Sequence, residues 1–130
     1  MKSKQLVEDL EFHQSVPFAQ PLFVRNDGRV LRWMLQPGQR ITEHSVPNSP
    51  FYVVVLKGHG MFATNGEPEQ EFGPNSLLIF DPGEAHTVRA LDEELVFVGF
   101  LQGVADMRPD RTGGEMAASQ IKETSYGQTN

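Results

Sequence analysis

The chain alternates between short apolar runs and clusters of glycine, proline and polar residues. The runs FYVVVL, SLLIF and ELVFVGF each have the length of a strand, and QPGQ, VPNSP and DPGE separate runs of this kind. Asn26, Asp27 and Gly28 tolerate the positive φ of a hairpin turn between two further β-rich runs. Short strands at even intervals without crossover helices are typical of an antiparallel sandwich or barrel. We therefore expect an all-β fold.

The two ends of the chain depart from this pattern. Within Ser3–Phe12, apolar residues recur at helical spacing behind a serine that could cap, which predicts a short N-terminal helix. The other end has few large apolar residues and many small polar ones, which predicts a disordered or loosely docked tail. We expect one domain, divided into 1–28 for the helix and first strands, 29–103 for the barrel core and 104–130 for the tail.

Composition narrows the possible functions. The 130 residues carry a formal charge of −6 from 11 basic and 17 acidic side chains, which disfavours a nucleic-acid or anionic-membrane surface, because such surfaces need clustered lysine and arginine. There is no cysteine, so disulfides, thiolate metal ligands and thiol nucleophiles are excluded. The opening MKSKQLVEDLEF lacks the apolar segment of a signal peptide, and no apolar run has transmembrane length. We expect a cytoplasmic protein.

The positions of two histidines and three glycines say most about the fold and the candidate site. Gly38, Gly58 and Gly83 lie at turns or strand ends, where a residue free to take positive φ relieves strain. His44 and His86 are far apart in the sequence, so only a closed barrel could bring them together. The spacing of these residues resembles the two motifs of the cupin superfamily.

The resemblance implies an antiparallel double-stranded β-helix, the RmlC-like jelly-roll barrel, usually assembled as a homodimer. In metal-binding cupins the first motif gives two histidines and a glutamate, and the second gives a further histidine, to a divalent transition metal. By position His44 and His86 match two of these ligands, whereas Val46 and Phe51 replace the other two. Two neutral imidazoles beside apolar side chains leave a divalent charge uncompensated. We expect a weak or absent site for Fe, Mn, Ni or Zn at His44 and His86.

The same four positions predict a pocket for a small molecule, formed by His44, His86, Val46 and Phe51. Glu84, two residues before His86, is the best spare carboxylate for a metal, although the direction of its side chain depends on the turn.

Strand alternation adds two expectations. If the strand around His44 is regular, Arg40 and Thr42 face the same side as His44. Trp33 and Met34 are neighbours and should not both face inward. The apolar side chains that could line a cavity are Trp33, Met34, Phe51, Met61 and Phe62.

Three functions remain open. The first is a small-molecule-binding barrel whose metal site is partly lost. The second is a metal-dependent enzyme of the dioxygenase, isomerase or decarboxylase type, in which His44 and His86 hold the metal and water or substrate completes its shell. The third is a non-catalytic sensory or structural dimer module. The sequence offers no phosphate-binding glycine loop and no nucleophilic triad.

Overall fold

The computed structural model describes residues 1–103, and this part of the chain contains nine β-strands and no helix. The strands are β1 (Phe18–Arg25), β2 (Gly28–Leu35), β3 (Arg40–His44), β4 (Phe51–Lys57), β5 (Gly60–Thr64), β6 (Gln70–Phe72), β7 (Leu77–Phe80), β8 (His86–Ala90) and β9 (Leu95–Gln102). The predicted tail, 104–130, lies outside the described residues.

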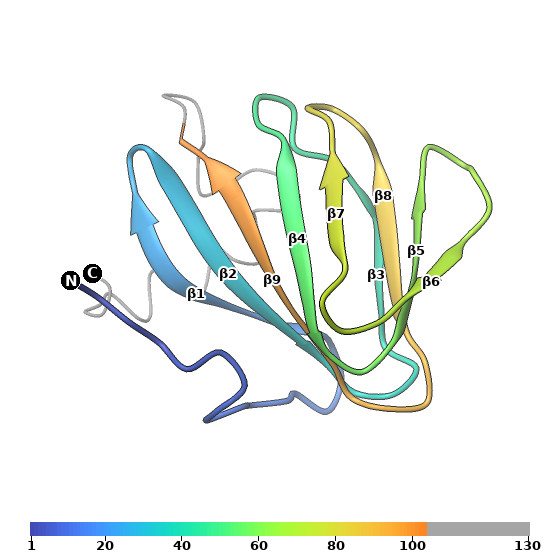
Figure 1. Cartoon of the computed structure of the whole chain (residues 1–130). Coiled ribbons are helices and arrows are strands. Elements are labelled where there is room, and N and C mark those ends of the chain that lie inside the picture. Colours follow the sequence, from blue (N-terminus) through green and yellow to red (C-terminus); the bar gives the residue numbers. More distant parts are fainter. Residues whose placement is uncertain (104–130) are drawn as a thin grey trace.

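The strands form two antiparallel sheets, which confirms the expected all-β jelly roll. One sheet has five strands in the order β1-β2-β9-β4-β7, and the other has four in the order β3-β8-β5-β6. Figure 1 shows the strands of the larger sheet from the left to the centre of the view and those of the smaller sheet on the right. β9 is the last of the described strands in the chain, yet it pairs with both β2 and β4 at the centre of the larger sheet.

The hydrophobic core lies between the sheets because alternate residues of each strand face inward. In β4 the inward residues are Phe51, Val53 and Val55, and in β8 they are His86, Val88 and Ala90, all of them buried. The remaining inward side chains are apolar almost throughout, so His86 is a polar residue within an apolar interior. The predicted hairpin at Asn26–Gly28 is the turn between β1 and β2.

The predicted N-terminal helix was wrong, and Arg32 supplies the physical reason. The Arg32 guanidinium is buried on the outer face of β2 and donates hydrogen bonds to the backbone carbonyls of Leu6 (3.1 Å), Glu8 (2.9 Å) and Asp9 (3.1 Å). A helix needs such carbonyls for its own i→i+4 bonds. Asp9 also has a φ of 53°, outside the right-handed helical region.

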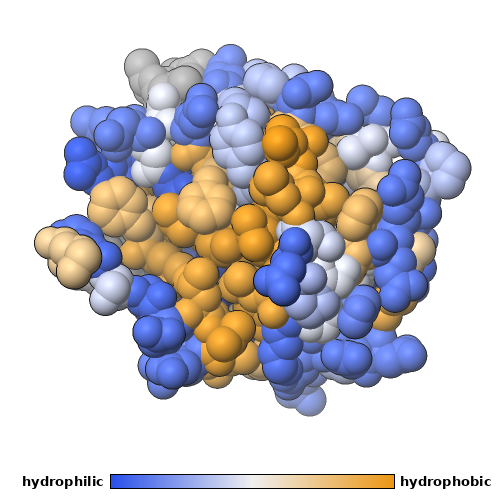
Figure 2. Space-filling view, in the orientation of Figure 1, coloured by the Kyte–Doolittle hydropathy of each residue, from blue (hydrophilic) through white to orange (hydrophobic). Residues whose placement is uncertain are grey.

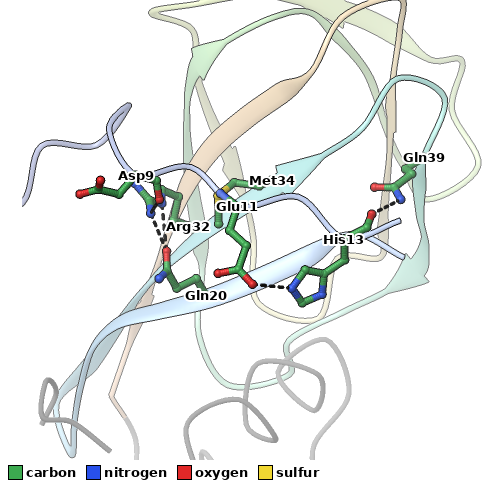
Figure 3. Close-up of polar contacts among 7 residues, drawn as sticks. All are labelled: Asp9, Glu11, His13, Gln20, Arg32, Met34 and Gln39. Atoms are coloured by element: carbon green, nitrogen blue, oxygen red, sulfur yellow. Dashed lines mark hydrogen bonds and ion pairs between the residues drawn. The ribbon is translucent and has the colours of Figure 1, made fainter. Parts of the chain in front are cut away.

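The segment 1–17 therefore runs as irregular chain across the outer face of the larger sheet (Figure 3). Gln20 accepts two further hydrogen bonds from Arg32, and the backbone N–H of Glu11 donates to the sulfur of Met34 at 3.2 Å. Trp33 faces the core and Met34 faces this segment, as alternation predicted, and both are buried. We name residues 1–17 the N-terminal segment.

No helix in the described part of the chain is long and apolar enough to cross a membrane.

Candidate functional site

β3 and β8 bring the two motif histidines to the same register position. The Cα partners are Arg40 with Arg89, Ile41 with Val88, and His44 with His86. Between Ile41 and His44 the register shifts, because two residues of β3, Thr42 and Glu43, stand opposite the single residue Thr87 of β8, which is the signature of a β-bulge.

Burial along β3 alternates up to the bulge. Ile41 is buried in the core, whereas Arg40 and Thr42 are exposed, so neither of them joins the interior beside β8. Beyond the bulge an extra residue changes the alternation, and the side chain of His44 lies outside the described part of the structure, so the expectation that Arg40 and Thr42 share its side stays a prediction.

His86 is buried, with an exposed fraction of 1%, and packs against two aromatic rings. Its ring centroid is 5.2 Å from that of Phe51 and 4.5 Å from that of Phe80, and both pairs are stacked. Its Nδ1 donates to the backbone carbonyl of Glu84 at 3.3 Å, which requires the proton on Nδ1. Its other ring nitrogen, Nε2, is buried as well.

Two neighbours hold this arrangement in place. Gly99 of β9 lies beside the Phe51 ring, and a Cβ at Gly99 would overlap that ring, so the missing side chain makes room for Phe51. Val46 is partly buried against the core, and its carbonyl accepts a hydrogen bond from the N–H of Gly83 at 2.8 Å. The loop after β3 is thereby tied to the turn before β8.

The described side chains do not fit a divalent metal. Among them no three His, Cys, Asp or Glu gather where they could hold an ion, and the side chain of His44 lies outside that described set. The carboxylate of Glu84 accepts the backbone N–H of Asp81 at 2.8 Å, which engages it in the turn. His59 is exposed, and His13 pairs with Glu11 at 3.0 Å. The imidazole of His86 packs against two phenyl rings, which are not the anionic partners that a buried divalent charge requires.

A cavity of about 240 Å³ opens between the two sheets where β6 and β7 form their free edges. We name it the β6–β7 cavity. Its lining consists of Phe62, Ala63, Thr64, Glu67, Pro68, Gln70, Phe72, Leu78, Ile79, Phe80 and Glu84.

The cavity and the histidine meet at two points. Phe80 lines the cavity and also stacks on His86. Thr64 lines the cavity and is the register partner of His86 on β5. The cavity is thus next to the predicted pocket, although none of its described residues His86, Val46 and Phe51 is among the lining residues.

Sequence reasoning named Phe62 and Glu84 and missed the other side chains that shape the cavity. Alternation along LLIF would have placed Leu78 and Phe80 on one face, but the short β7 gave no indication of which face is inward. A glycine inside the apolar run VFVGF signals a close approach, and it would have pointed to the contact between Gly99 and Phe51.

One ion pair lies next to the cavity on the outer side of the smaller sheet. Arg89 of β8 donates to Glu69 at 2.9 Å. The hydrogen bond from Arg89 lowers the pKa of the Glu69 carboxyl, while Glu69 raises the pKa of Arg89. On the inner face of β2, burial lowers the pKa of Arg29.

Comparison with known proteins agrees with this architecture. The family model of the cupin domain matches residues 31–100. No curated protein matches the chain.

Several solved structures are similar in fold. An uncharacterized conserved protein with a double-stranded β-helix domain from Klebsiella pneumoniae has a TM-score of 0.73 at 20% identity, over 78% of this chain and 90% of that one. An RmlC-like cupin protein from Desulfovibrio desulfuricans has a TM-score of 0.71 at 24% identity, over 80% and 99%. A putative mannose-6-phosphate isomerase from Ralstonia eutropha has a TM-score of 0.70 at 19% identity, over 80% and 100%. At these identities the likeness concerns the fold, which hosts both enzymes and uncharacterized proteins.

Proposed function

Because the chain belongs to the cupin family, we propose that it binds a small molecule between its two sheets, in the β6–β7 cavity, without a resident metal ion. One observation carries the proposal: the cavity is lined by the buried aromatic side chains of Phe62 and Phe80 together with a few polar residues. Apolar concavities with a small number of polar groups are typical of small-molecule sites.

The cavity is small for a ligand site. At about 240 Å³ it lies below the range of roughly 300 to 1,000 Å³ that is common for drug-sized ligands. We therefore infer a ligand with a single ring or a short branched chain. Because Phe80 both lines the cavity and stacks on His86, we expect a bound ligand to change the surroundings of the His86 ring.

Adjacent residues of β7 provide a matched test. Leu78 lines the cavity, whereas Leu77 points to the opposite face and is 62% exposed. Titration with phenol, followed by ¹H–¹⁵N NMR, should shift the amide signals of cavity residues. Leu78→Trp should abolish these shifts by filling the cavity, and Leu77→Trp should preserve them. Shifts that map away from the cavity, or that survive Leu78→Trp, would contradict the proposal.

The metal part of the proposal has its own test. Elemental analysis of protein prepared without an affinity tag should find no stoichiometric transition metal. Full occupancy that is lost in His86→Ala would instead favour the metal-dependent enzyme.

A second candidate function, a dimer module, is favoured by an uncovered apolar face of the larger sheet. Register places Tyr52 opposite both Phe100 and Ile79, and Val54 opposite Leu77. We name these five residues the outer apolar face. Leu77, Ile79 and Phe100 have exposed fractions of 62%, 57% and 38%. Figure 2 shows a broad hydrophobic area in the centre of this view, bordered by hydrophilic residues.

We propose that a second copy of the chain covers this face. In a symmetric dimer each subunit presents the same surface to the other. Because the chain has a formal charge of −6, two copies repel each other wherever their acidic side chains meet. The outer apolar face has no charged side chain, so a copy can approach there without that cost. The N-terminal segment already covers the adjoining part of the same sheet, around Arg32 and Met34.

Sedimentation velocity tests this assembly. Leu77→Glu should convert the dimer to a monomer while leaving the thermal midpoint of the isolated fold nearly unchanged, because Leu77 is exposed in the single chain. Val16→Glu, a control at an exposed apolar residue outside the face, should leave the dimer intact. A monomeric unmutated chain would exclude this candidate.

A further inference from the structure

Two of the lining residues of the β6–β7 cavity, Glu67 and Glu84, come from two turns that are hydrogen bonded to each other. One turn follows β5 and the other joins β7 to β8. The N–H of Asn65 donates to the carbonyl of Ala85 at 2.9 Å, and the N–H of Ala85 donates to Oδ1 of Asn65 at 3.1 Å. Each turn gives one carboxylate to the lining, Glu67 and Glu84. The backbone therefore fixes the positions from which both carboxylates extend.

Local hydrogen bonds support each of these two residues. The Glu84 carboxylate accepts the N–H of Asp81 at 2.8 Å, which restrains its side chain and leaves further acceptor positions on its oxygens. The N–H of Glu67 donates to the carbonyl of Thr64 at 2.7 Å, which closes the first turn.

Among the side chains that the structure describes, none with a positive charge lines the cavity. The described lining contains no lysine, arginine or histidine. Arg89, the cation of the nearby ion pair, is bound by Glu69 on the outer side of the sheet. Arg29 faces inward on β2, but β9 and β4 separate that strand from β7. An anionic ligand would meet two carboxylates and no cation among these described lining residues.

The walls are aromatic. Phe62 and Phe80 are buried, with exposed fractions of 3% and 4%, and Phe72 contacts Phe62 edge to face with ring centroids 5.9 Å apart. The faces of aromatic rings attract cations, and the attraction grows as water is excluded. Exposed Glu67 and half-buried Glu84 share one lining with buried aromatic rings, and this combination matches an organic cation better than a neutral or anionic molecule.

We propose that the ligand of the β6–β7 cavity is a small organic cation, a primary or quaternary amine on a compact apolar body. Its ammonium group pairs with Glu67 and Glu84, and its apolar body packs against Phe62, Phe72 and Phe80. This inference rests on the proposed function, since it assigns the ligand class of the same cavity.

Three probes of nearly equal size distinguish the effect of ligand charge from that of ligand shape. They are benzylamine, benzyl alcohol and benzoate. Each is titrated into the full chain and followed by ¹H–¹⁵N NMR. Benzylamine should bind about tenfold more tightly than benzyl alcohol, and benzoate should bind most weakly. Raising the ionic strength should weaken the binding of benzylamine and leave that of benzyl alcohol unchanged.

The variants isolate the two carboxylates. The double change Glu67→Gln with Glu84→Gln should reduce the preference for benzylamine over benzyl alcohol from about tenfold to near unity, while benzyl alcohol binds as before. The amide introduced by Glu84→Gln keeps an oxygen that can accept the N–H of Asp81, so the turn is retained. Glu71→Gln is the matched control, because Glu71 is an exposed carboxylate of β6 outside the cavity lining, and it should leave the preference unchanged.

The outcomes distinguish this inference from the proposed function. Equal affinity for benzylamine and benzyl alcohol would contradict the assignment of a cationic ligand, and so would a preference that persists in the double variant. In either case the proposal that the cavity binds a small uncharged molecule would stand. Failure of all three probes to bind the unmutated chain overturns both proposals.

Discussion

Gly58 shows how much one backbone conformation can determine. It has a φ of 77° between β4 and β5, and a Cβ there would overlap the backbone carbonyl of Glu94. Gly58→Ala therefore adds a steric collision to the cost of the left-handed conformation. We expect the free energy of unfolding to fall by about 3 kcal/mol, measured by urea denaturation.

Gly66 provides the matched control for this prediction. Its φ is 79°, yet nothing lies within 4 Å of a Cβ at this position. Gly66→Ala should cost only about 1 kcal/mol, the conformational part of the effect. If the two variants lost the same stability, the collision with Glu94 would be unimportant.

The sequence predicted these turn positions well and the surroundings of His86 poorly. Gly38, Gly58 and Gly83 all have positive φ, as a local rule about glycine predicts. Even Asn75, which stands where the cupin motif has glycine, has a φ of 72°. The stacking of His86, by contrast, depends on contacts between residues distant in sequence, and no local pattern contains them.

Among the longer elements, the N-terminal segment illustrates the same limit. Its apolar spacing predicts a helix, but the buried guanidinium of Arg32 on another strand binds three of its backbone carbonyls. Arg32 can donate five hydrogen bonds, and leaving them unmet in a buried position would cost more than a short isolated helix gains. Tertiary contacts therefore override the local preference.

Replacing Arg32 tests this account. Arg32→Met removes the hydrogen bonds to Leu6, Glu8 and Asp9, so the N-terminal segment should detach from the sheet. We expect the Glu11 amide, which donates to Met34, to lose its protection from hydrogen exchange, and the free energy of unfolding to fall by about 2 kcal/mol. Arg25→Met, at an exposed position on β1, should change neither quantity.

The ion pair between Arg89 and Glu69 links β8 to the segment before β6 and predicts a dependence on pH. Because its pKa is lowered in the folded state, Glu69 contributes stability that is fully present above its unfolded pKa and is lost as the pH falls through the folded value. The melting temperature of the unmutated chain should exceed that of Glu69→Gln at neutral pH, and the difference should vanish in acid. A constant difference across this range would show that the charge of Glu69 is not responsible.

The molecule as a whole depends on β9, which joins the strands on either side of it into one sheet. A chain ending at Gly103 keeps all nine described strands, and we expect it to unfold cooperatively in urea. A chain ending at Glu94 lacks β9, so β2 and β4 lose their shared partner, and its circular dichroism should show no cooperative transition. Cooperative folding of the shorter chain would show that the two halves of the sheet are stable apart.

The overall architecture was the most predictable level of the molecule. Strand length, turn residues and even spacing indicate a jelly roll without reference to any particular contact, and the two sheets confirm it. The β-bulge in β3 and the cavity between β6 and β7 were not predictable, since both follow from how the strands are aligned rather than from their composition.

The central place of β9 also sets the order of events during synthesis. A ribosome releases β2 and β4 long before residues 95–102, which form the strand between them. Until then each of the two strands has an unpaired backbone edge and exposed apolar side chains. Pairing over so many intervening residues is slow, and such unpaired edges are prone to aggregate. We therefore expect the nascent chain to be most prone to aggregation just before β9 emerges, and a holdase chaperone that binds unpaired strands to have its greatest effect in that interval.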